Sequence, residues 1–438
     1  MKAGGRLAAA VEVLTDVETR RRPVTDALKD WGLNHRFAGS GDRTAIGNLV
    51  HDALRRRNSL AHVMGDSSPR ALVLAAYAMV WGRGVDGLTL ALAEPHAPEP
   101  LTEAERAALS RPDPLADAPL AAAADVPEWL VPSLVRVFGD RLVEEGRRLA
   151  ERAPVDIRAN TLKSTRDKVL AALAEFGAFA TALSPGGVRV PIGAGPAKPP
   201  HVLAEPGYQK GMFEIQDEGS QLAALVADAK PGEQVIDLCA GGGGKTLALA
   251  ASMSNGGQIY AYDNDRRRFG DIWQRLERAG VRNVQVLSPK LKAETPEPFP
   301  SVLLPHEGKA DLVLVDAPCT GTGTWRRRPD AKWRVTESAL ADRQREQDAV
   351  LAQAARLVRP GGRIVYVTCS LLAEENEDRL AAFLADHPDF TLVSPVPPGL
   401  PGLDRFVTNL IGLGQALRLT PASAGTDGFF VARLVRKG

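Results

Sequence analysis

The sequence predicts an α/β protein whose C-terminal half is a doubly wound, mainly parallel sheet. Two observations support this prediction. From about residue 206 onward, short apolar runs rich in β-branched residues alternate with helical segments, and several of these runs break into turns containing Gly, Pro or Ser. Such runs are typical of buried parallel strands, and alternation with helices indicates right-handed βαβ units. Because ligands of these folds bind outside the carboxyl ends of the strands, a functional site is expected there.

The length of 438 residues is too great for one ordinary domain, and the composition, 44% hydrophobic and 24% charged, is typical of a soluble globular protein. We expect three parts: a helical region with a linker over residues 1–125, a small α/β module over 126–205, and a Rossmann-like sheet domain over 206–438.

The N-terminal parts are predicted from periodicity. Apolar residues recur at spacings of three and four in LAAAVEVL and AIGNLVHDAL, which predicts helices through residues 5–92. Residues 93–127 are rich in Pro and Ala and resemble a linker with one short helix at 102–109. The next part contains a helix around LVPSLVRVFGDRLVEEGRRLAERA, a strand at DIRANTL and a helix at STRDKVLAALAEFG. This alternation predicts a ferredoxin-like or RNA-recognition-like module.

The sheet domain is predicted from six strands with helices between them. The strands are QVIDLCA, GQIYAYD, NVQVLS, DLVLVDA, GRIVYVT and FFVARLV; the helices include TLALAASMS, RRFGDIWQRLERAG and ADRQREQDAVLAQAARLV. The last element, DGFFVARLVRKG, is expected to close the sheet as an antiparallel strand.

Composition limits the class of protein further. The three cysteines are too far apart for a disulfide framework or a zinc cage, and the seven histidines are scattered, so we expect a reducing compartment and no structural metal. Glu12 and Asp16 interrupt the first apolar run, which therefore fails as a signal peptide. The longest apolar stretch, 71–81, is too short to cross a bilayer. We expect a cytoplasmic protein that does not associate with membranes.

A glycine-rich loop follows the first predicted strand of the sheet domain, in VIDLCAGGGGKT. Gly241, Gly242, Gly243 and Gly244 let the backbone approach a ligand closely, and Thr246 opens the next helix. The following strand ends in Asp263, 22 residues after Gly241, where an acid can hold the ribose hydroxyls of a nucleotide-like ligand.

Two ligands compete for this loop. A phosphate-binding P-loop would need glycine at position 239, which is Cys239, and would give the later cysteines no role. S-adenosylmethionine carries no phosphate, so it needs the close approach and the ribose acid alone, and we favour it.

The other two cysteines also follow predicted strands. DLVLVDAPCTGTGT places Asp316 and Cys319 at one strand end, and GRIVYVTCS places Cys369 at another. In the doubly wound order these strands are neighbours, so two thiols and a carboxylate are expected to converge. A single cysteine at a strand end is more often a small buried side chain, but two thiols converging on an acid favour function. A thiolate that adds to C6 of a pyrimidine makes C5 nucleophilic enough to accept a methyl group.

These motifs resemble the Nol/Nop/Sun family of RNA cytosine-5 methyltransferases, and most of all its bacterial members that act on small-subunit (16S) rRNA. The resemblance covers residues 128–438 and is carried by RANTLK, EIQDEGSQ, DLCAGGGGKT, DAPCTGTG, RRRPDAKW, VTCSLLAEENE and the terminal DGFFVARL. It implies a class I S-adenosylmethionine-dependent methyltransferase domain and an N-terminal NusB-like RNA-binding domain.

The resemblance also implies roles for individual residues. Cys369 matches the nucleophile that bonds C6 of the target cytosine, and Cys319 matches the cysteine that helps to release the enzyme after transfer. Asp316 matches the acid near the cytosine N3, and Lys245 matches the lysine beside the target nucleotide. The S-adenosylmethionine site corresponds to Cys239, Ala240, Gly241, Gly242, Gly243, Gly244, Lys245, Asp263 and Asp316.

This sequence departs from the family pattern at two places. Gly242 stands where the family usually has proline, which gives a more flexible loop. Ser288 and Pro289 stand where the family tends to place an aspartate near the adenine, so backbone groups are an alternative means of holding that base.

The resemblance implies RNA as the partner. The net charge is only +1, but basic residues are clustered at 20–22, 55–57, 266–268 and 326–328; for the two N-terminal clusters, an arginine-rich genome composition is an equally good explanation. The loop from Trp325 to Trp333 lies beside Cys319 in the sequence and is expected to stack on bases and contact phosphates. In the N-terminal region, Arg55, Arg56 and Arg57 are candidate phosphate contacts. A monomer is expected. The alternatives to a 16S rRNA enzyme are a tRNA cytosine-5 methyltransferase and a non-catalytic RNA-binding assembly factor that retains the fold.

Overall fold

The computed structural model describes residues 1–288, 299–400 and 402–438, and these residues form two compact units. The first, called here the helical unit, comprises Met1–Ala153, Ile192–Pro199 and Thr324–Val335. The second, called here the sheet unit, comprises Pro154–Pro191, Pro200–Gly323 and Thr336–Gly438. Residues 126–153 group with the N-terminal helices in this division into two units. The division into three parts at residues 125 and 205, expected from the sequence, stays a prediction.

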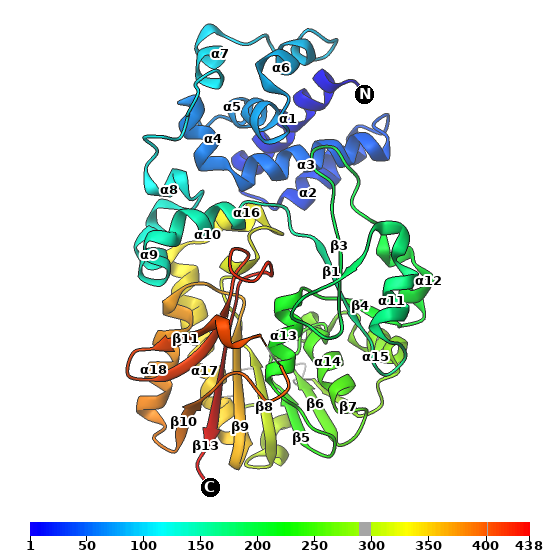
Figure 1. The fold of residues 1–438 in the computed structure, drawn as a ribbon, viewed down its shortest axis with the longest axis vertical. Helices are drawn as coiled ribbons and strands as arrows, with labels where there is room; N and C mark the ends of the chain where they lie inside the picture. The colour runs from blue at the N-terminus through cyan, green and yellow to red at the C-terminus, as the bar shows by residue number, and fades with distance from the viewer. Residues whose placement is uncertain (289–298, 401) are drawn as a thin grey trace. The chain divides into compact units, whose positions relative to one another are not determined.

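The helical unit is built from amphipathic helices, as the periodicity predicted (Figure 1). Leu7, Ala10, Leu14 and Val17 recur at helical spacing and are all buried. The helices are α1 (Ala3–Arg20), α2 (Val24–Asn34), α3 (Ser40–Arg55), α4 (Arg57–Met64), α5 (Pro69–Ala75), α6 (Gly84–Leu92), α7 (Glu103–Leu109), α8 (Leu120–Ala123), α9 (Val131–Phe138), α10 (Leu142–Leu149) and α16 (Pro329–Arg334).

The short helix predicted at 102–109 within the linker is confirmed as α7, which begins with a capping box between Thr102 and Glu105. One detail of this unit differs from the prediction. The single helix predicted before residue 153 is broken into α9 and α10 at Gly139, whose φ of +54° no continuing helix can adopt.

The small sheet of the sheet unit has the strand order β2-β3-β1-β4 and is antiparallel. It consists of β1 (Val155–Ala159), β2 (Phe179–Ala180), β3 (Gly187–Val190) and β4 (Phe213–Ile215), with α11 (Arg166–Ala172) and α12 (Pro206–Gln209) beside it. The predicted strand at DIRANTL and the helix after it are confirmed as β1 and α11.

The large sheet carries nine strands within the described residues, in the order β11-β12-β13-β9-β8-β5-β6-β7, with β10 paired to β13. The strands are β5 (Gln234–Asp237), β6 (Gln258–Tyr262), β7 (Val284–Leu287), β8 (Ala310–Asp316), β9 (Val358–Thr368), β10 (Phe390–Val393), β11 (Val407–Leu410), β12 (Gly414–Leu419) and β13 (Phe429–Arg436). Strands β5 to β9 are parallel, and β13 pairs antiparallel with β9. The α/β fold class and the antiparallel closing strand are therefore confirmed.

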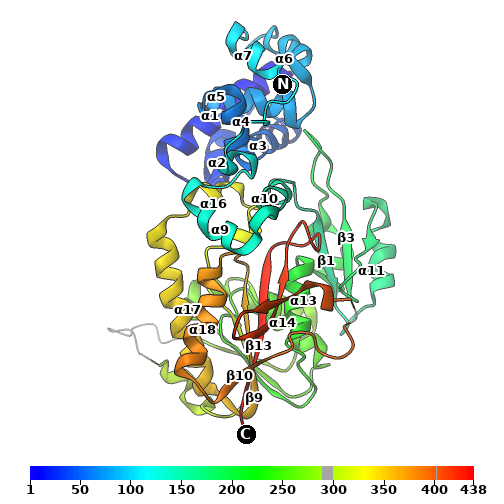
Figure 2. The same cartoon turned by 60° about the vertical axis from the view of Figure 1, so that its left-hand side comes forward.

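Helices cover both faces of this sheet (Figure 2), because alternate residues of the buried strands point to opposite sides. On β8, Val313 and Val315 pack with α17 (Glu337–Leu357) and α18 (Glu377–Asp386), whereas Leu312 and Leu314 pack with α13 (Glu218–Val226) and α14 (Gly244–Ser252). Helix α15 (Ile272–Ala279) packs beside β6. The strand order reverses between β5 and β8, which is where a ligand site is expected in such a fold.

Candidate active site

The thiols of Cys319 and Cys369 meet at the carboxyl ends of β8 and β9. These strands are parallel neighbours, and their register pairs Asp316 with Val367. Each cysteine follows shortly after its strand ends, and the two Sγ atoms lie 3.4 Å apart. The convergence predicted from the sequence is therefore present.

The two loops that carry the thiols are joined by hydrogen bonds. The amide of Gly323 donates to the carbonyl of Cys369 at 2.9 Å, and the amide of Leu371 donates to Oγ1 of Thr322 at 2.8 Å. The hydrogen-bond contact with Cys369 and, next, burial raise the pKa of Cys319 well above its usual value. Cys319 is thus held as a protonated thiol that can donate a hydrogen bond to the sulfur of Cys369.

Lys245 and Asp316 form an ion pair next to the thiols. Lys245 Nζ lies 2.7 Å from Asp316 Oδ2, and the lysine is only 8% exposed. Burial opposes a charge on Lys245, but the attraction of Asp316 outweighs it, so the pKa of the lysine is raised. The Cys369 sulfur contributes in the same direction more weakly, which places a stable cation close to that thiol.

The glycine loop runs from Cys239 to Lys245, between β5 and α14. Gly241 and Gly243 have φ values of +50° and +79°, a left-handed conformation that favours glycine. The amide of Ala240 donates to the carbonyl of Tyr262 at 2.8 Å, which holds the loop against the end of β6. Cys239 lies in this loop rather than with the other thiols, and burial raises its pKa well above the usual value.

Two further carboxylates lie at this end of the sheet. Asp263 is 1% exposed, and its two oxygens accept the amides of Gly241 at 3.1 Å and Asp265 at 3.0 Å. Asp237 accepts the hydroxyl of Thr246 at 2.7 Å, and burial raises its pKa to about 7. Burial also raises the pKa of Asp263.

These carboxylates argue against the P-loop alternative. A P-loop lysine and threonine serve phosphate oxygens and Mg²⁺, but here Lys245 pairs with Asp316 and Thr246 donates to Asp237. The acids Asp237, Asp263 and Asp316, at the ends of β5, β6 and β8, disfavour a polyphosphate and suit an uncharged ribose.

Arg275, on α15, is a loop contact that the sequence did not reveal. Its Nη1 donates to the carbonyl of Gly242 at 2.5 Å, and its Nη2 donates to the buried carboxylate of Glu214 at 3.1 Å. Arg278 shares Glu214 at 2.6 Å. Gly242 stands where the family usually has proline, and Arg275 restrains the loop at this position through the Gly242 carbonyl. Of the two residues in place of the adenine acid, Ser288 ends the described segment after β7, and Pro289 lies outside the described residues.

The expectation that residues 325–333 form an RNA-stacking loop is wrong for most of its side chains. Trp325 and Lys332 are each 1% exposed and Arg326 is 5% exposed, and residues Pro329–Arg334 form helix α16 in the helical unit. The indole of Trp333 donates to the carbonyl of Leu54. Arg55 is also unsuited as a phosphate contact, because it pairs with Asp52 and donates to the carbonyl of Arg326.

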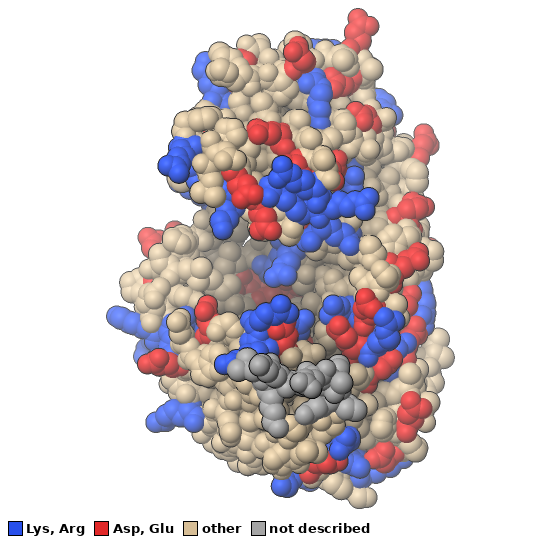
Figure 3. Space-filling view, turned by 180° about the vertical axis from the view of Figure 1, so that it is seen from behind, with Lys and Arg blue, Asp and Glu red and all other residues tan. Residues whose placement is uncertain are grey.

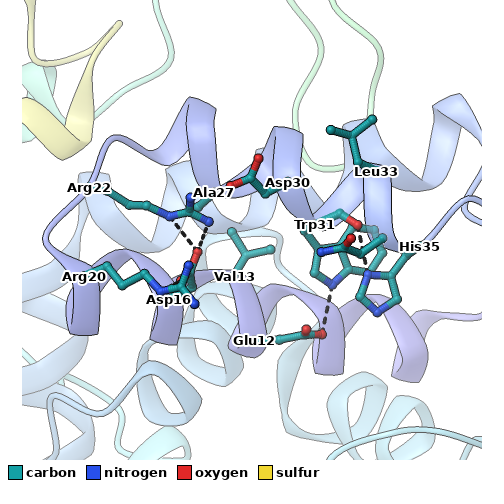
Figure 4. A pocket seen from close by; sticks show the side chains of 11 residues that line it. Glu12, Val13, Asp16, Arg20, Arg22, Ala27, Asp30, Trp31, Leu33 and His35 are labelled. Carbon is teal, nitrogen blue, oxygen red and sulfur yellow. Dashed lines mark hydrogen bonds and ion pairs between the residues drawn. The ribbon is translucent and has the colours of Figure 1, made fainter.

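The helical unit carries a basic surface and a polar cavity. Lys and Arg side chains gather on the helical unit, on the face of the molecule that Figure 3 shows. A cavity of about 350 Å³ lies between α1 and α2 (Figure 4), where Arg22 pairs with Asp16 and Asp30 and Trp31 donates to Glu12. Asp16 and Asp30 are thus paired with Arg22, and Glu12 is bonded to the indole of Trp31.

Neither a metal site nor a membrane span is found in the part of the chain that the structure describes. Within it, no group of three or more His, Cys, Asp and Glu side chains could hold a metal ion, and no helix is long and apolar enough to cross a bilayer.

Comparison with known proteins gives consistent matches. A family model described as 16S rRNA methyltransferase RsmB/F matches residues 224–435, and the ferredoxin-like domain of RsmF/B-like methyltransferases matches residues 126–192. Ribosomal RNA small subunit methyltransferase B of Sodalis glossinidius is 32% identical over 313 residues, which cover 71% of this chain and 66% of that protein. The match thus spans slightly less than two thirds of the length of this curated relative.

Two solved structures share the fold. The crystal structure of PH0851 matches with a TM-score of 0.71 and 27% identity over 99% of both chains. The structure of NSun6 from Pyrococcus horikoshii with SFG matches with a TM-score of 0.60 and 23% identity, covering 71% of this chain and 98% of that one. The first match extends the likeness to the N-terminal helices, and the second supports the fold of the sheet unit.

Proposed function

Because the chain belongs to the RsmB/F family of methyltransferases, whose cofactor is S-adenosylmethionine, we propose that it is an RNA cytosine-5 methyltransferase acting on small-subunit rRNA. The observation that carries the proposal is the pair of thiols 3.4 Å apart beside the Lys245–Asp316 ion pair. An rRNA methyltransferase that methylates a nitrogen atom, and not C5 of cytosine, would need no thiol in this site.

In this proposal the two cysteines act in sequence. The Cys369 thiolate adds to C6 of an unpaired cytosine, and the electron pair of the C5–C6 double bond moves to C5, which takes the methyl group while the sulfur of S-adenosylmethionine keeps the electron pair of the broken bond. The C5 proton then passes to solvent, and the protonated Cys319 assists release by donating a hydrogen bond to the sulfur of Cys369. The electron pair of the C5–H bond re-forms the double bond as the C6–S bond breaks, and Cys369 leaves as a thiolate.

Lys245 and Asp316 would act on the target base. Asp316 would contact the N3 side of the cytosine, and the Lys245 ammonium, which Asp316 keeps charged, would lie beside the target nucleotide. Because both side chains are held by their ion pair, they need little rearrangement when the base enters.

The residues present fit the cofactor. S-adenosylmethionine supplies an electrophilic methyl group when bound. Asp263 would accept its ribose hydroxyls, since each carboxylate oxygen is used by one backbone amide and keeps a further lone pair. The Cys239–Lys245 loop would lie against the ligand, and the buried Oδ1 of Asp237 has no hydrogen-bond partner within the described residues.

The proposed partner is small-subunit rRNA with an exposed cytosine, met by a monomer in the cytoplasm. Such a base must be unpaired or flipped to reach a site at the strand ends. The basic surface of the helical unit in Figure 3 is a candidate for contact with the phosphate backbone.

The test uses the full chain, S-adenosylmethionine and 16S rRNA. We expect the wild type to produce 5-methylcytosine at one position in bisulfite sequencing. Cys319→Ala should accumulate a covalent protein–RNA adduct on a denaturing gel, because release is impaired, and Cys369→Ala should form none. Methylation of tRNA but not rRNA would favour the tRNA alternative. RNA binding without methylation would favour the assembly-factor alternative, and an adduct with Cys369→Ala but not Cys319→Ala would reverse the two roles.

A further inference from the structure

Two buried side chains hold the peptide groups on either side of Cys319. The carbonyl of Pro318, in the peptide group before Cys319, accepts a hydrogen bond from Nε2 of Gln347 at 2.9 Å. The amide of Thr320, in the peptide group after Cys319, donates to Oε1 of Glu375 at 2.8 Å. Both peptide planes that set the direction of the Cys319 side chain are therefore fixed by side chains from outside the loop.

The two holding side chains are also bonded to each other. Gln347 Nε2 donates to Glu375 Oε1 at 3.0 Å, and the hydroxyl of Thr320 donates to the second oxygen, Oε2. The phenol of Tyr366, on β9, donates to the backbone carbonyl of Glu375 at 2.6 Å. Gln347 and Glu375, called here the Gln–Glu clamp, thus form one network with the loop.

The clamp is costly to bury, which argues for a purpose. Gln347 and Glu375 are each 0% exposed, on α17 and in the turn before α18. Burial raises the pKa of Glu375, because the charged carboxylate is disfavoured there. Buried amides and carboxyl groups are tolerated where hydrogen bonds compensate for lost hydration. Here Glu375 bonds to the Cys319 loop, and Gln347 bonds to it through Nε2, whereas the buried Oε1 of Gln347 has no partner within the described residues.

We propose that Gln347 and Glu375 are positioning residues that hold Cys319 at its 3.4 Å contact with Cys369, so that the enzyme can be released after methyl transfer. This inference rests on the proposed function. Gln347 bonds to the Cys319 loop and to Glu375, whereas Glu375 also interacts with Ser370, next to Cys369. The Cys369 loop keeps its own bonds from Gly323 and to Thr322. Loss of Gln347 therefore disturbs release and leaves attack on C6 in place.

The experiment compares Glu375→Ala and Gln347→Ala with wild type and Cys319→Ala, all as the full chain. Glu375→Ala should lower turnover by about 10- to 100-fold, the range expected for a small misplacement of a reacting group. It should also accumulate the covalent RNA adduct seen with Cys319→Ala. A residue with only a structural role would lower the adduct and the turnover together.

Two further variants serve as controls. Glu375→Gln keeps an oxygen that can accept from Thr320 and Gln347, so it should retain turnover within about threefold of wild type and form no excess adduct. The second control is Glu346→Ala. Glu346 is next to Gln347 in the sequence, but its side chain is 40% exposed and pairs with Arg343, so this variant should behave as wild type.

The outcomes separate this inference from the proposed function. Adduct accumulation by Glu375→Ala and Gln347→Ala, with rescue in Glu375→Gln, supports the clamp. Adduct with Cys319→Ala but none with either clamp variant overturns it while the proposed function stands. No adduct with Cys319→Ala overturns both. If Glu375→Ala fails to fold, as judged by thermal unfolding, Gln347→Ala decides the question because the carboxylate remains.

Discussion

The chemistry of a cysteine in this site depends on what surrounds its sulfur. Cys319 keeps its proton because Cys369 and burial both raise its pKa. Cys369 lies near the ammonium of Lys245, which Asp316 keeps charged. The same side chain can therefore serve two tasks, as a hydrogen donor in one loop and as a candidate nucleophile in the next.

Asp237 gives a prediction at the scale of one residue. Its pKa is raised by burial from 3.8 to about 7, so the folded state holds a proton that the unfolded chain has lost between these pH values. The contribution of Asp237 to the free energy of unfolding is therefore greatest below pH 4. It declines as the pH rises to about 7, by up to roughly 4 kcal/mol. Asp237→Asn removes this decline, and urea unfolding at pH 5 and pH 8 should show the variant gaining stability relative to wild type.

The matched control for this prediction is Asp265→Asn. The bond to Arg267 lowers the pKa of Asp265, so this carboxylate is charged in both states throughout that range. Between pH 5 and pH 8, the free energy of unfolding of Asp265→Asn should change by the same amount as that of the wild type. Parallel curves for wild type and Asp237→Asn would contradict the assignment.

The convergence of the proposed reacting groups could be predicted from the sequence, but the groups that hold them could not. Cys319, Cys369, Asp316 and Lys245 each lie at or shortly after the end of a strand, or at the start of a helix, so the parallel topology alone brings them together. Gln347 lies in the middle of α17, where a buried amide leaves no periodic signal. That Gln347 and Glu375 are fully buried can be known only from the packing of the folded chain.

At the scale of elements, α15 restrains the glycine loop. Arg275 and Arg278 lie three residues apart on one face of this helix, and both bind the buried carboxylate of Glu214, on β4 of the small sheet. Only Arg275 also reaches the carbonyl of Gly242. The small sheet is therefore linked to the cofactor loop through a single helix of the sheet unit.

This arrangement allows a matched pair of variants. Arg275→Ala and Arg278→Ala each remove one ion pair with Glu214, but only the first frees the loop at Gly242. We expect Arg275→Ala to weaken S-adenosylmethionine binding about tenfold, equivalent to roughly 1.4 kcal/mol, as measured by calorimetry. Arg278→Ala should bind the cofactor nearly as wild type, and equal losses in both variants would mean that Glu214, not the loop contact, controls affinity.

For the whole molecule, the notable feature is how the two units share the chain. The backbone passes between them at five places, after residues 153, 191, 199, 323 and 335. The sequence predicted residues 325–333 as an exposed loop because Arg and Trp lie beside a catalytic motif. Their burial depends on carbonyl groups at the end of α3 and on Asp125, some 200 or more residues away, which no local pattern can reveal.

Lys332 tests this feature. Its ammonium donates to the carbonyls of Arg55 at 2.8 Å and Asp125 at 2.6 Å. Lys332→Met leaves two buried acceptors unpaired, at about 1–3 kcal/mol each. Hydrogen exchange should show loss of amide protection in α3 and in residues 324–335. The control is Lys29→Met, the same change at an exposed position of α2, which should leave amide protection unchanged. Unchanged protection in Lys332→Met would mean that the hydrogen bonds of Lys332 contribute nothing to stability.

The placement of α16 in the helical unit also governs how the protein is made. When residue 153 leaves the ribosome, the N-terminal helices lack the segment that binds the free carbonyls at the end of α3. That segment is complete only after 182 more residues, roughly 10 to 40 s of synthesis at about 5–20 residues per second. The helical unit thus completes its folding late, and a nascent chain or a fragment ending before residue 324 leaves the carbonyls of Leu54 and Arg55 without the side chains that bind them.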